Sequence, residues 1–165
     1  MIHELDGDIL LSEAQVIAHG VSPNDDFHQG LALQLREGMP AMYKDFRHHC
    51  KAMHPKPGEL LAWKAGEGRL LVHLFTQEPA YDHGSKPGRA TLSHVNHALH
   101  ALRGLVVKEV LTSVALPRLA CGVGGVAGCP AADRQAAGQP GYPDLCLCEL
   151  PCQKEGQRAQ MKLAG

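Results

Sequence analysis

The feature that most constrains this chain is a short apolar run that leads into a cluster of glycines. Residues 110–116 (VLTSVAL) are mostly apolar, and the run has the length of a buried strand. Pro117 ends the run, because proline has no amide hydrogen for a strand ladder. Gly122, Gly124 and Gly125 follow closely. Such a turn is either an ordinary strand-to-helix connection or a loop whose amides can approach an anion.

Patterns elsewhere in the chain predict strands that alternate with helices. Glycines and prolines mark residues 19–30 and 77–89 as loops. Gly104 is expected to end the last predicted helix. Strands are predicted at residues 2–5, 15–18, 59–65 and 69–76, and helices at residues 31–37, 40–50 and 91–103. This order predicts a layered α/β domain with helices on both faces of the sheet.

Composition limits the classes of protein that the chain can belong to. Its 165 residues suit a single domain, and 16 basic residues balance 17 acidic ones to a net charge of −1. This balance argues against binding nucleic acid through bulk charge. Apolar runs stay shorter than the roughly 20 residues of a membrane helix, and the N-terminus is acidic where a signal peptide is basic. We therefore expect a cytoplasmic monomer that does not engage membranes.

The histidine and cysteine patterns do not predict a metal or a disulfide framework. His94, His97 and His100 are spaced for one helix face, which suits either a metal or solvated side chains, and we favour the latter. Cys50 and Cys121 stand apart from the other cysteines, which gather near the C-terminus. A disulfide scaffold would distribute its cysteines through the fold.

Residues 127–165 differ in character from residues 1–126, which we expect to form the domain core. This tail has no apolar stripe and is predicted to be disordered. Codons compatible with residues 142–154 (YPDLCLCELPCQK), when read one nucleotide later, can encode an alternating strand with a basic end. We therefore hypothesise a frameshift near Val126, in the gene or in the reported sequence. The alternative is a zinc knuckle formed by Cys129, Cys146, Cys148 and Cys152, although a paired CxxC is missing.

Three segments, taken in order, resemble those of a macro domain, the α/β module that binds ADP-ribose. They are GDI at residues 7–9, VIAHGVS at 16–22 followed by GLA at 30–32, and ALPRLACGVGG at 115–125. The chain is most similar to the branch of DNA-ADP-ribose glycohydrolase antitoxins and terminal ADP-ribose glutamate hydrolases, over about residues 2–126. The resemblance implies a three-layer α/β/α fold with a mixed central sheet. It also implies that the C-terminal helix and strand are missing or altered here.

The resemblance further implies a ligand site made of two facing loops. Asp8 would accept a hydrogen bond from the adenine amino group, with Ile9 beside the ring. Residues 18–31 would lie along the distal ribose and the diphosphate, and residues 120–126 would wrap the diphosphate from the other side. A helix start and a glycine nest both present amides to an anion. The implied ligand-binding residues are Asp8, Ile9, Ala18, His19, Val21, Ser22, Gly30, Leu31, Thr76, Pro117, Leu119, Ala120, Cys121, Gly122, Val123, Gly124, Gly125 and Val126.

The residues that would carry out catalysis in this branch are replaced here. Hydrolytic members have a lysine after the threonine that ends the fourth strand, and this chain has Gln77. Glutamate-specific members use an aspartate where this chain has Gly124, and the asparagine of the commoner branch has no equivalent, because Asn24 lies beyond the turn. His19 and His28 are therefore the candidate bases, unless they are simply polar surface residues.

These observations predict a protein that binds ADP-ribose or an ADP-ribosylated protein or DNA, without a cofactor. One alternative is a hydrolase that removes ADP-ribose from protein or DNA. Another is a truncated product without function, because a lost C-terminal helix and strand would expose the sheet. A Rossmann-like nucleotide-binding enzyme is disfavoured, because the first predicted strand is not followed by GxGxxG.

Overall fold

The computed structural model describes residues 2–3, 8–79, 81, 87–117, 119 and 159–162. Strands and helices alternate along this part of the chain. In chain order the elements are β1 (Ile2–His3), the 3-10 helix η1 (Ile9–Leu11), β2 (Val16–Val21), α1 (Gly30–Gly38), α2 (Pro40–Met53), β3 (Leu60–Lys64), the 3-10 helix η2 (Gly66–Gly68), β4 (Leu70–Phe75), α3 (Leu92–Lys108), β5 (Ser113–Leu116) and β6 (Ala159–Lys162).

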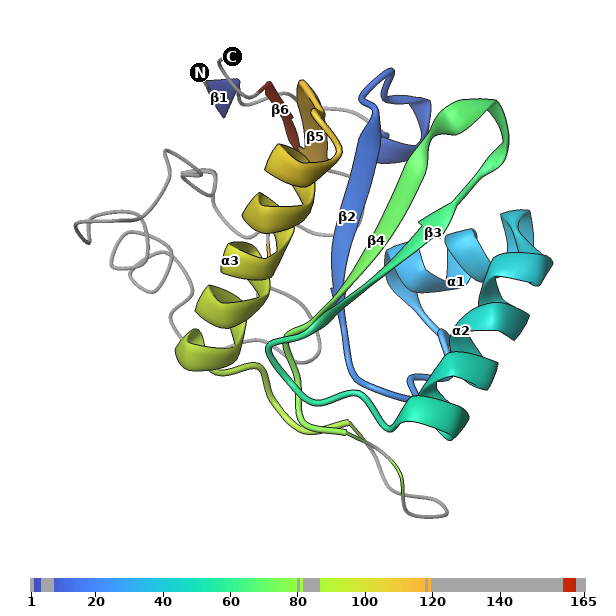
Figure 1. Cartoon of the computed structure of the whole chain (residues 1–165). Coiled ribbons are helices and arrows are strands. Elements are labelled where there is room, and N and C mark those ends of the chain that lie inside the picture. Colours follow the sequence, from blue (N-terminus) through green and yellow to red (C-terminus); the bar gives the residue numbers. More distant parts are fainter. Residues whose placement is uncertain are drawn as a thin grey trace.

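The strands form one mixed six-stranded sheet in the order β1-β6-β5-β2-β4-β3. Strand β2 runs parallel to both β4 and β5, whereas β3 is antiparallel to β4 and β6 is antiparallel to β5 and β1. Helices α1 and α2 lie on one face of the sheet, and α3 lies on the other (Figure 1). The predicted α/β class, with three layers and a mixed sheet, is therefore confirmed.

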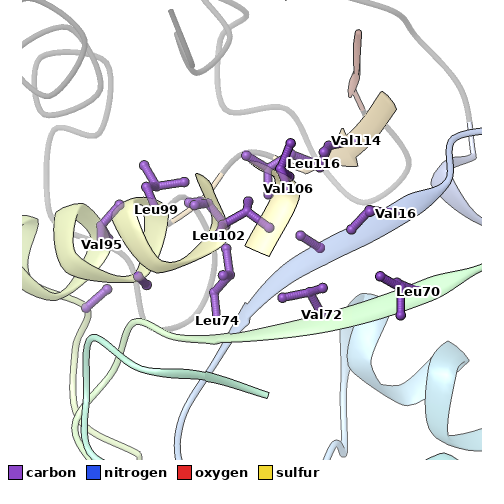
Figure 2. Close-up of a cluster of buried hydrophobic side chains, with 14 residues drawn as sticks. Val16, Leu70, Val72, Leu74, Val95, Leu99, Leu102, Val106, Val114 and Leu116 are labelled. Carbon is purple, nitrogen blue, oxygen red and sulfur yellow. The ribbon is translucent and has the colours of Figure 1, made fainter. Parts of the chain in front are cut away.

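Alternate residues of the central strands point into two separate cores, because side chains alternate along a strand. The α3-side core, part of which Figure 2 shows, consists of Val16, Ala18, Leu70, Val72, Leu74, Ala90, Val95, Ala98, Leu99, Leu102, Val106, Val114, Leu116 and Leu119. The α1/α2-side core consists of Ile9, Ala14, Ile17, Val21, Phe27, Leu35, Met42, Phe46, Cys50, Leu71, Phe75 and Ala115. Strands buried on both faces explain the continuous apolar runs in the sequence.

Helices α1 and α2 form where local sequence and burial agree. Gly38 lies at the end of α1, and Pro40 occupies the first turn of α2, where its fixed φ suits a helix start. Met42, Phe46 and Cys50 recur every four residues along α2 and are buried against the sheet. Both helices were predicted, and α2 extends three residues beyond the predicted end at Cys50.

Helix α3 begins as predicted but does not end at Gly104. The Thr91 hydroxyl accepts a hydrogen bond from the amide of His94 at 3.2 Å, which caps the first turn. The helix continues through Gly104 to Lys108, and Val106 extends the buried stripe beyond the glycine. Burial of this next turn outweighs the roughly 1 kcal/mol that an interior glycine costs a helix.

Two predicted strand boundaries were wrong. The strand predicted at residues 110–116 begins only at Ser113, because α3 continues to Lys108 and Val110 lies in a turn with φ of 54°. The strand predicted at residues 15–18 continues to Val21, because β2 pairs with β4 over its full length. His19 therefore lies in a central strand rather than in the predicted loop.

The predicted tail contains a strand that the sequence did not reveal. Strand β6 lies between β1 and β5, and Met161 pairs with both Ile2 and Val114. The glycine loop at 120–126 and the four cysteines of the proposed zinc knuckle lie outside the described residues. Among the residues that are described, the helices are too short or too polar to span a membrane.

Candidate functional site

Three parallel strands place their carboxyl ends at one edge of the sheet. These strands are β5, β2 and β4, in that order across the sheet. The chain leaves β2 toward α1 on one face and leaves β4 toward α3 on the other (Figure 1). Ligands of open α/β sheets bind where connections diverge in this way. We therefore consider this carboxyl edge as the candidate site.

Several residues that the resemblance implied meet at this edge. The amide of Thr76 donates to the carbonyl oxygen of Val21 at 3.1 Å, which joins the ends of β4 and β2. A Cβ atom added to Gly20 would lie 2.8 Å from the Thr76 hydroxyl oxygen and 3.4 Å from a methyl carbon of Leu119. The ends of β2 and β4 and the segment after β5 are thus in close contact.

The side chains of the implied residues in and after β2 point into the protein. Ala18 packs in the α3-side core, and Val21 packs in the α1/α2-side core. The Ser22 hydroxyl is buried and donates to the carbonyl oxygen of Glu78 at 2.8 Å, with Pro23 as a second acceptor at 3.1 Å. These residues can therefore offer a ligand their main chain rather than their side chains.

His19 is a buried residue of β2 and not the exposed loop residue that was expected. Its Nε2 lies 2.7 Å from Nδ1 of His73 on β4, and both side chains are buried. Burial lowers the pKa of His19 to about 3, and burial also lowers the pKa of His73. The His19 imidazole is therefore neutral and a weak base at pH 7, which removes the physical ground for giving it the role of an exposed base.

The loop from Ser22 to Gln29 is tightly structured. The amide of Asp25 donates to the carbonyl oxygen of Ser22 at 3.1 Å, and the Asp25 carboxylate accepts from the amide of Phe27 at 2.8 Å. The Phe27 ring is fully buried and packs against the rings of Tyr43 and Phe46, with centroids 5.4 and 4.6 Å away. An aromatic anchor thus fastens the middle of the loop to the core.

Two arginines hold the main chain of the same loop. Arg47 of α2 donates through Nη1 to the carbonyl oxygen of Asn24 at 2.6 Å and to that of Asp25 at 3.4 Å. Arg36 of α1 donates to the carbonyl oxygen of Asp26 at 3.1 Å, and its guanidinium lies 4.9 Å from the centroid of the Tyr43 ring. The loop is therefore tied to both helices that follow it.

The loop ends at the first turn of α1, where the implied anion contacts are expected. Gly30 opens the helix with φ of 62° and is exposed, and Leu31 is half-buried. Within the part of the chain that is described, Gln29 precedes the helix without capping it through its side chain. The first amides of an uncapped helix are open to a ligand or to water.

The second candidate base, His28, lies on the exposed side of the loop. Its Nδ1 is paired with a carboxylate oxygen of Asp26. With Asp25, these residues bring three potential metal-ligand atoms within 4.8 Å of one another. Exposed acidic groups commonly occur without a metal, so this spacing alone does not identify a metal centre.

Of the remaining implied residues, Asp8 and Ile9 precede β2, whereas Pro117 follows β5. Asp8 is exposed and caps η1, accepting from the amide of Leu10 at 2.9 Å. Ile9 is buried in the α1/α2-side core, and Pro117 is half-buried directly after β5. Residues 120–126 lie outside the described part of the chain, so the second implied loop remains a prediction.

Sequence reasoning missed the residues that shape the first loop. Phe27 is the lone aromatic residue within the polar segment 19–30, and that contrast was the available signal. His73 interrupts the apolar run of β4, which was a signal for a buried polar partner. Arg47 gave no such signal, because a single arginine on a helix is usually a solvated residue.

Comparison with solved structures identifies the fold. The chain superposes on the macrodomain of Mycobacterium tuberculosis DarG with a TM-score of 0.72 and 20% identity, covering 83% of this chain and 90% of that one. For the macrodomain of Thermus aquaticus DarG the TM-score is 0.69 at 20% identity, with coverage of 83% and 88%. For Thermosipho africanus DarTG in complex with ADP-ribose it is 0.64 at 19% identity, with coverage of 83% and 38%.

Sequence comparison adds no further match: no family model and no curated protein corresponds to this sequence. Agreement at this level of identity identifies the architecture of the chain and not its activity. The order of elements, the mixed sheet and the superpositions lead to one conclusion. The chain has the macrodomain fold.

Proposed function

We propose that this protein binds ADP-ribose, or ADP-ribosylated protein or DNA, through main-chain amides of two segments, residues 18–31, from the end of β2 to the start of α1, and residues 120–126. The observation that carries the proposal is the structured loop after β2, which leads into the uncapped start of α1 at the carboxyl edge. The macrodomain fold supports it, since the similar structure of Thermosipho africanus DarTG is a complex with ADP-ribose.

The chemistry of the first loop suits a diphosphate. Open amides at a helix start carry a partial positive charge, and aligned peptide dipoles favour an anion there. The exposed Gly30 allows a ligand to approach the main chain closely. Such recognition uses neutral donors, so it is compatible with a net charge of −1. Asp8 would supply the acceptor for the adenine amino group.

Calorimetric titration with ADP-ribose tests the proposal, and Gln29→Asp is the informative variant. An aspartate before α1 would cap the helix and preserve its stability, but its negative charge would compete with a diphosphate for the same amides. We expect ADP-ribose to bind the parent chain and to bind Gln29→Asp at least tenfold more weakly. Gln34→Glu is the matched control, because it adds the same charge on the exposed side of α1.

The result that contradicts this proposal is specific. A folded parent chain that gives neither heat nor a thermal shift with ADP-ribose would exclude the binding function. Equal losses in Gln29→Asp and Gln34→Glu would indicate a general charge effect rather than a contact at the start of α1. If binding is absent here but present in a frame-restored chain, the truncated, non-functional alternative is correct.

Hydrolysis of ADP-ribosyl bonds is the second candidate function, and the position of Gln77 bears on it. Gln77 lies two residues after the end of β4, directly after Thr76, and forms an isolated antiparallel β-bridge with Ala90. A glutamine lacks the nucleophilic or cationic nitrogen of a lysine. We expect the parent chain to release no ADP-ribose from modified protein or DNA. If the parent chain does release ADP-ribose, the protein is a hydrolase and the binding proposal is wrong. The variant Gln77→Lys tests whether a lysine at this position is sufficient for activity.

A further inference from the structure

The loop after β2 contains two residues in a backbone conformation that L-amino acids rarely adopt. Asn24 has φ of 62° and Phe27 has φ of 52°. Asparagine tolerates this left-handed region, but a bulky aromatic residue does so only at a cost. Strained conformations persist where the surroundings enforce them, and they gather at ligand sites. The contacts of this loop should therefore reveal what enforces the strain.

The contacts that enforce the conformation come from both ends of the strained segment. Phe27 is fixed by burial of its ring and by the bond from its amide to the Asp25 carboxylate. Asn24 is fixed by Arg47, whose Nη1 lies 2.6 Å from its carbonyl oxygen. Arg47 is half-buried and lies one residue after Phe46, which is buried in the α1/α2-side core. The helix position from which the Arg47 side chain extends is therefore held by the core.

We propose that Arg47 is a positioning residue that holds residues 22–29 in their ligand-binding conformation before the ligand arrives. The inference rests on the proposed function and deepens it. Arg47 donates to main-chain carbonyl oxygens of Asn24 and Asp25, so it acts on the ligand through the loop and not by contact. A loop that is ordered during folding need not be ordered again on binding, and this raises affinity.

Arg47 differs in this role from the second arginine of the loop. Arg36 donates to the carbonyl oxygen of Asp26, beyond the left-handed Asn24, and it is exposed. Arg47 instead contacts Asn24, a central residue of the turn, and Asp25, whose amide closes that turn on the carbonyl oxygen of Ser22. Loss of the Arg47 guanidinium would leave the carbonyl oxygen of Asn24 without that donor, and the turn would be free to relax toward ordinary backbone angles.

The test compares three variants by two measurements. Arg47→Met keeps an unbranched stem and removes the guanidinium, whereas Arg47→Lys keeps one charged donor. Trp63→Phe is the matched control. It removes the 2.9 Å hydrogen bond that Trp63 of β3 donates through Nε1 to the carboxylate of Asp45. Asp45 lies on α2, as Arg47 does, but this hydrogen bond does not involve the loop. The measurements are hydrogen exchange of the Asp25 and Phe27 amides in the free protein and the Kd for ADP-ribose.

We expect both amides to exchange at least tenfold faster in Arg47→Met, and ADP-ribose to bind about tenfold more weakly, with a less favourable binding entropy. Arg47→Lys should give intermediate values, and it replaces Arg47→Met in the comparison if the latter does not fold. Trp63→Phe should change neither measurement, even if it lowers the melting temperature.

Each contrary result has a distinct meaning. Unchanged amide exchange in Arg47→Met would show that Arg47 does not order the loop, whatever the ligand does. Faster exchange with an unchanged Kd would separate loop order from binding and overturn the positioning role. Absence of ADP-ribose binding by the parent chain would overturn the proposed function and the binding role with it, while the exchange data would still decide whether Arg47 orders the loop.

Discussion

The buried pair of His19 and His73 makes the stability of this domain depend on pH. Desolvation lowers the pKa of His19 from 6.5 to about 3 and lowers that of His73 well below 6.5. In the unfolded chain both imidazoles are exposed and take up protons near pH 6.5. The unfolded state therefore binds more protons than the folded state below that pH, so the free energy of unfolding falls as the pH falls from about 6.5 toward 3.

The size of the effect follows from the shift of His19. Each unit of pKa difference is worth about 1.4 kcal/mol, and at pH 5 about one and a half units of the shift are expressed. His19 alone should therefore cost about 2 kcal/mol of stability between pH 7.5 and pH 5. His73 acts in the same direction, but the two rings are in contact and titrate as a pair, so their effects do not simply add.

Two other titratable groups, His49 and Asp25, also affect the pH dependence of stability. His49 of α2 helps to lower the pKa of His73 through its charge. Burial raises the pKa of Asp25, and a raised carboxyl pKa favours the folded state as the pH falls, which opposes the effect of the histidines. A variant lacking only the two buried histidines should therefore lose less stability on acidification than the parent chain does.

The assay is urea unfolding at pH 7.5 and at pH 5 of the parent chain and of the double variant His19→Leu, His73→Leu. The double variant replaces the pair with apolar side chains and retains His49 and Asp25. The parent should lose about 2 kcal/mol or more on acidification, and the double variant should lose at least 1 kcal/mol less. An equal loss in both proteins would refute the assignment of acid sensitivity to this pair.

Two glycines provide further predictions about the packing that supports the site. Gly20→Ala should destabilise the fold by about 1–3 kcal/mol in urea unfolding, since its Cβ would lie 2.8 Å from the Thr76 hydroxyl oxygen. Adding Thr76→Ala should restore part of the lost stability. If it restores none, a clash with Thr76 is not the cause of the loss. Gly58→Ala should lower stability by a similar amount, because Gly58 has φ of 94° and a Cβ would lie 2.9 Å from that of His97. A Cβ at Gly66 would have no described atom within 4 Å, so the free energy of unfolding of Gly66→Ala should stay within about 0.5 kcal/mol of that of the parent. A larger change would show that losses at Gly20 and Gly58 do not report steric contact.

Sequence periodicity predicted helices and strands correctly where a local signal, such as a proline or a turn glycine, agreed with the pattern of buried residues. Pro40 and the four-residue spacing of Met42, Phe46 and Cys50 predicted α2, and the hairpin of β3 and β4 was predicted around Gly66. The same reasoning failed at Gly104 and at His19. A glycine or a histidine has a weak local preference there, and packing against the sheet is the stronger effect.

The sequence by itself therefore determined the alternation of strands and helices, the two-sided burial of the central strands and the resemblance to macro domains, because these depend on spacing along the chain. Only the tertiary structure decided that His19 pairs with His73, that Phe27 anchors the loop and that Arg47 holds its main chain. These contacts join residues from different elements. Local sequence pattern does not predict which residues of different elements come into contact, because the packing of the whole domain decides this.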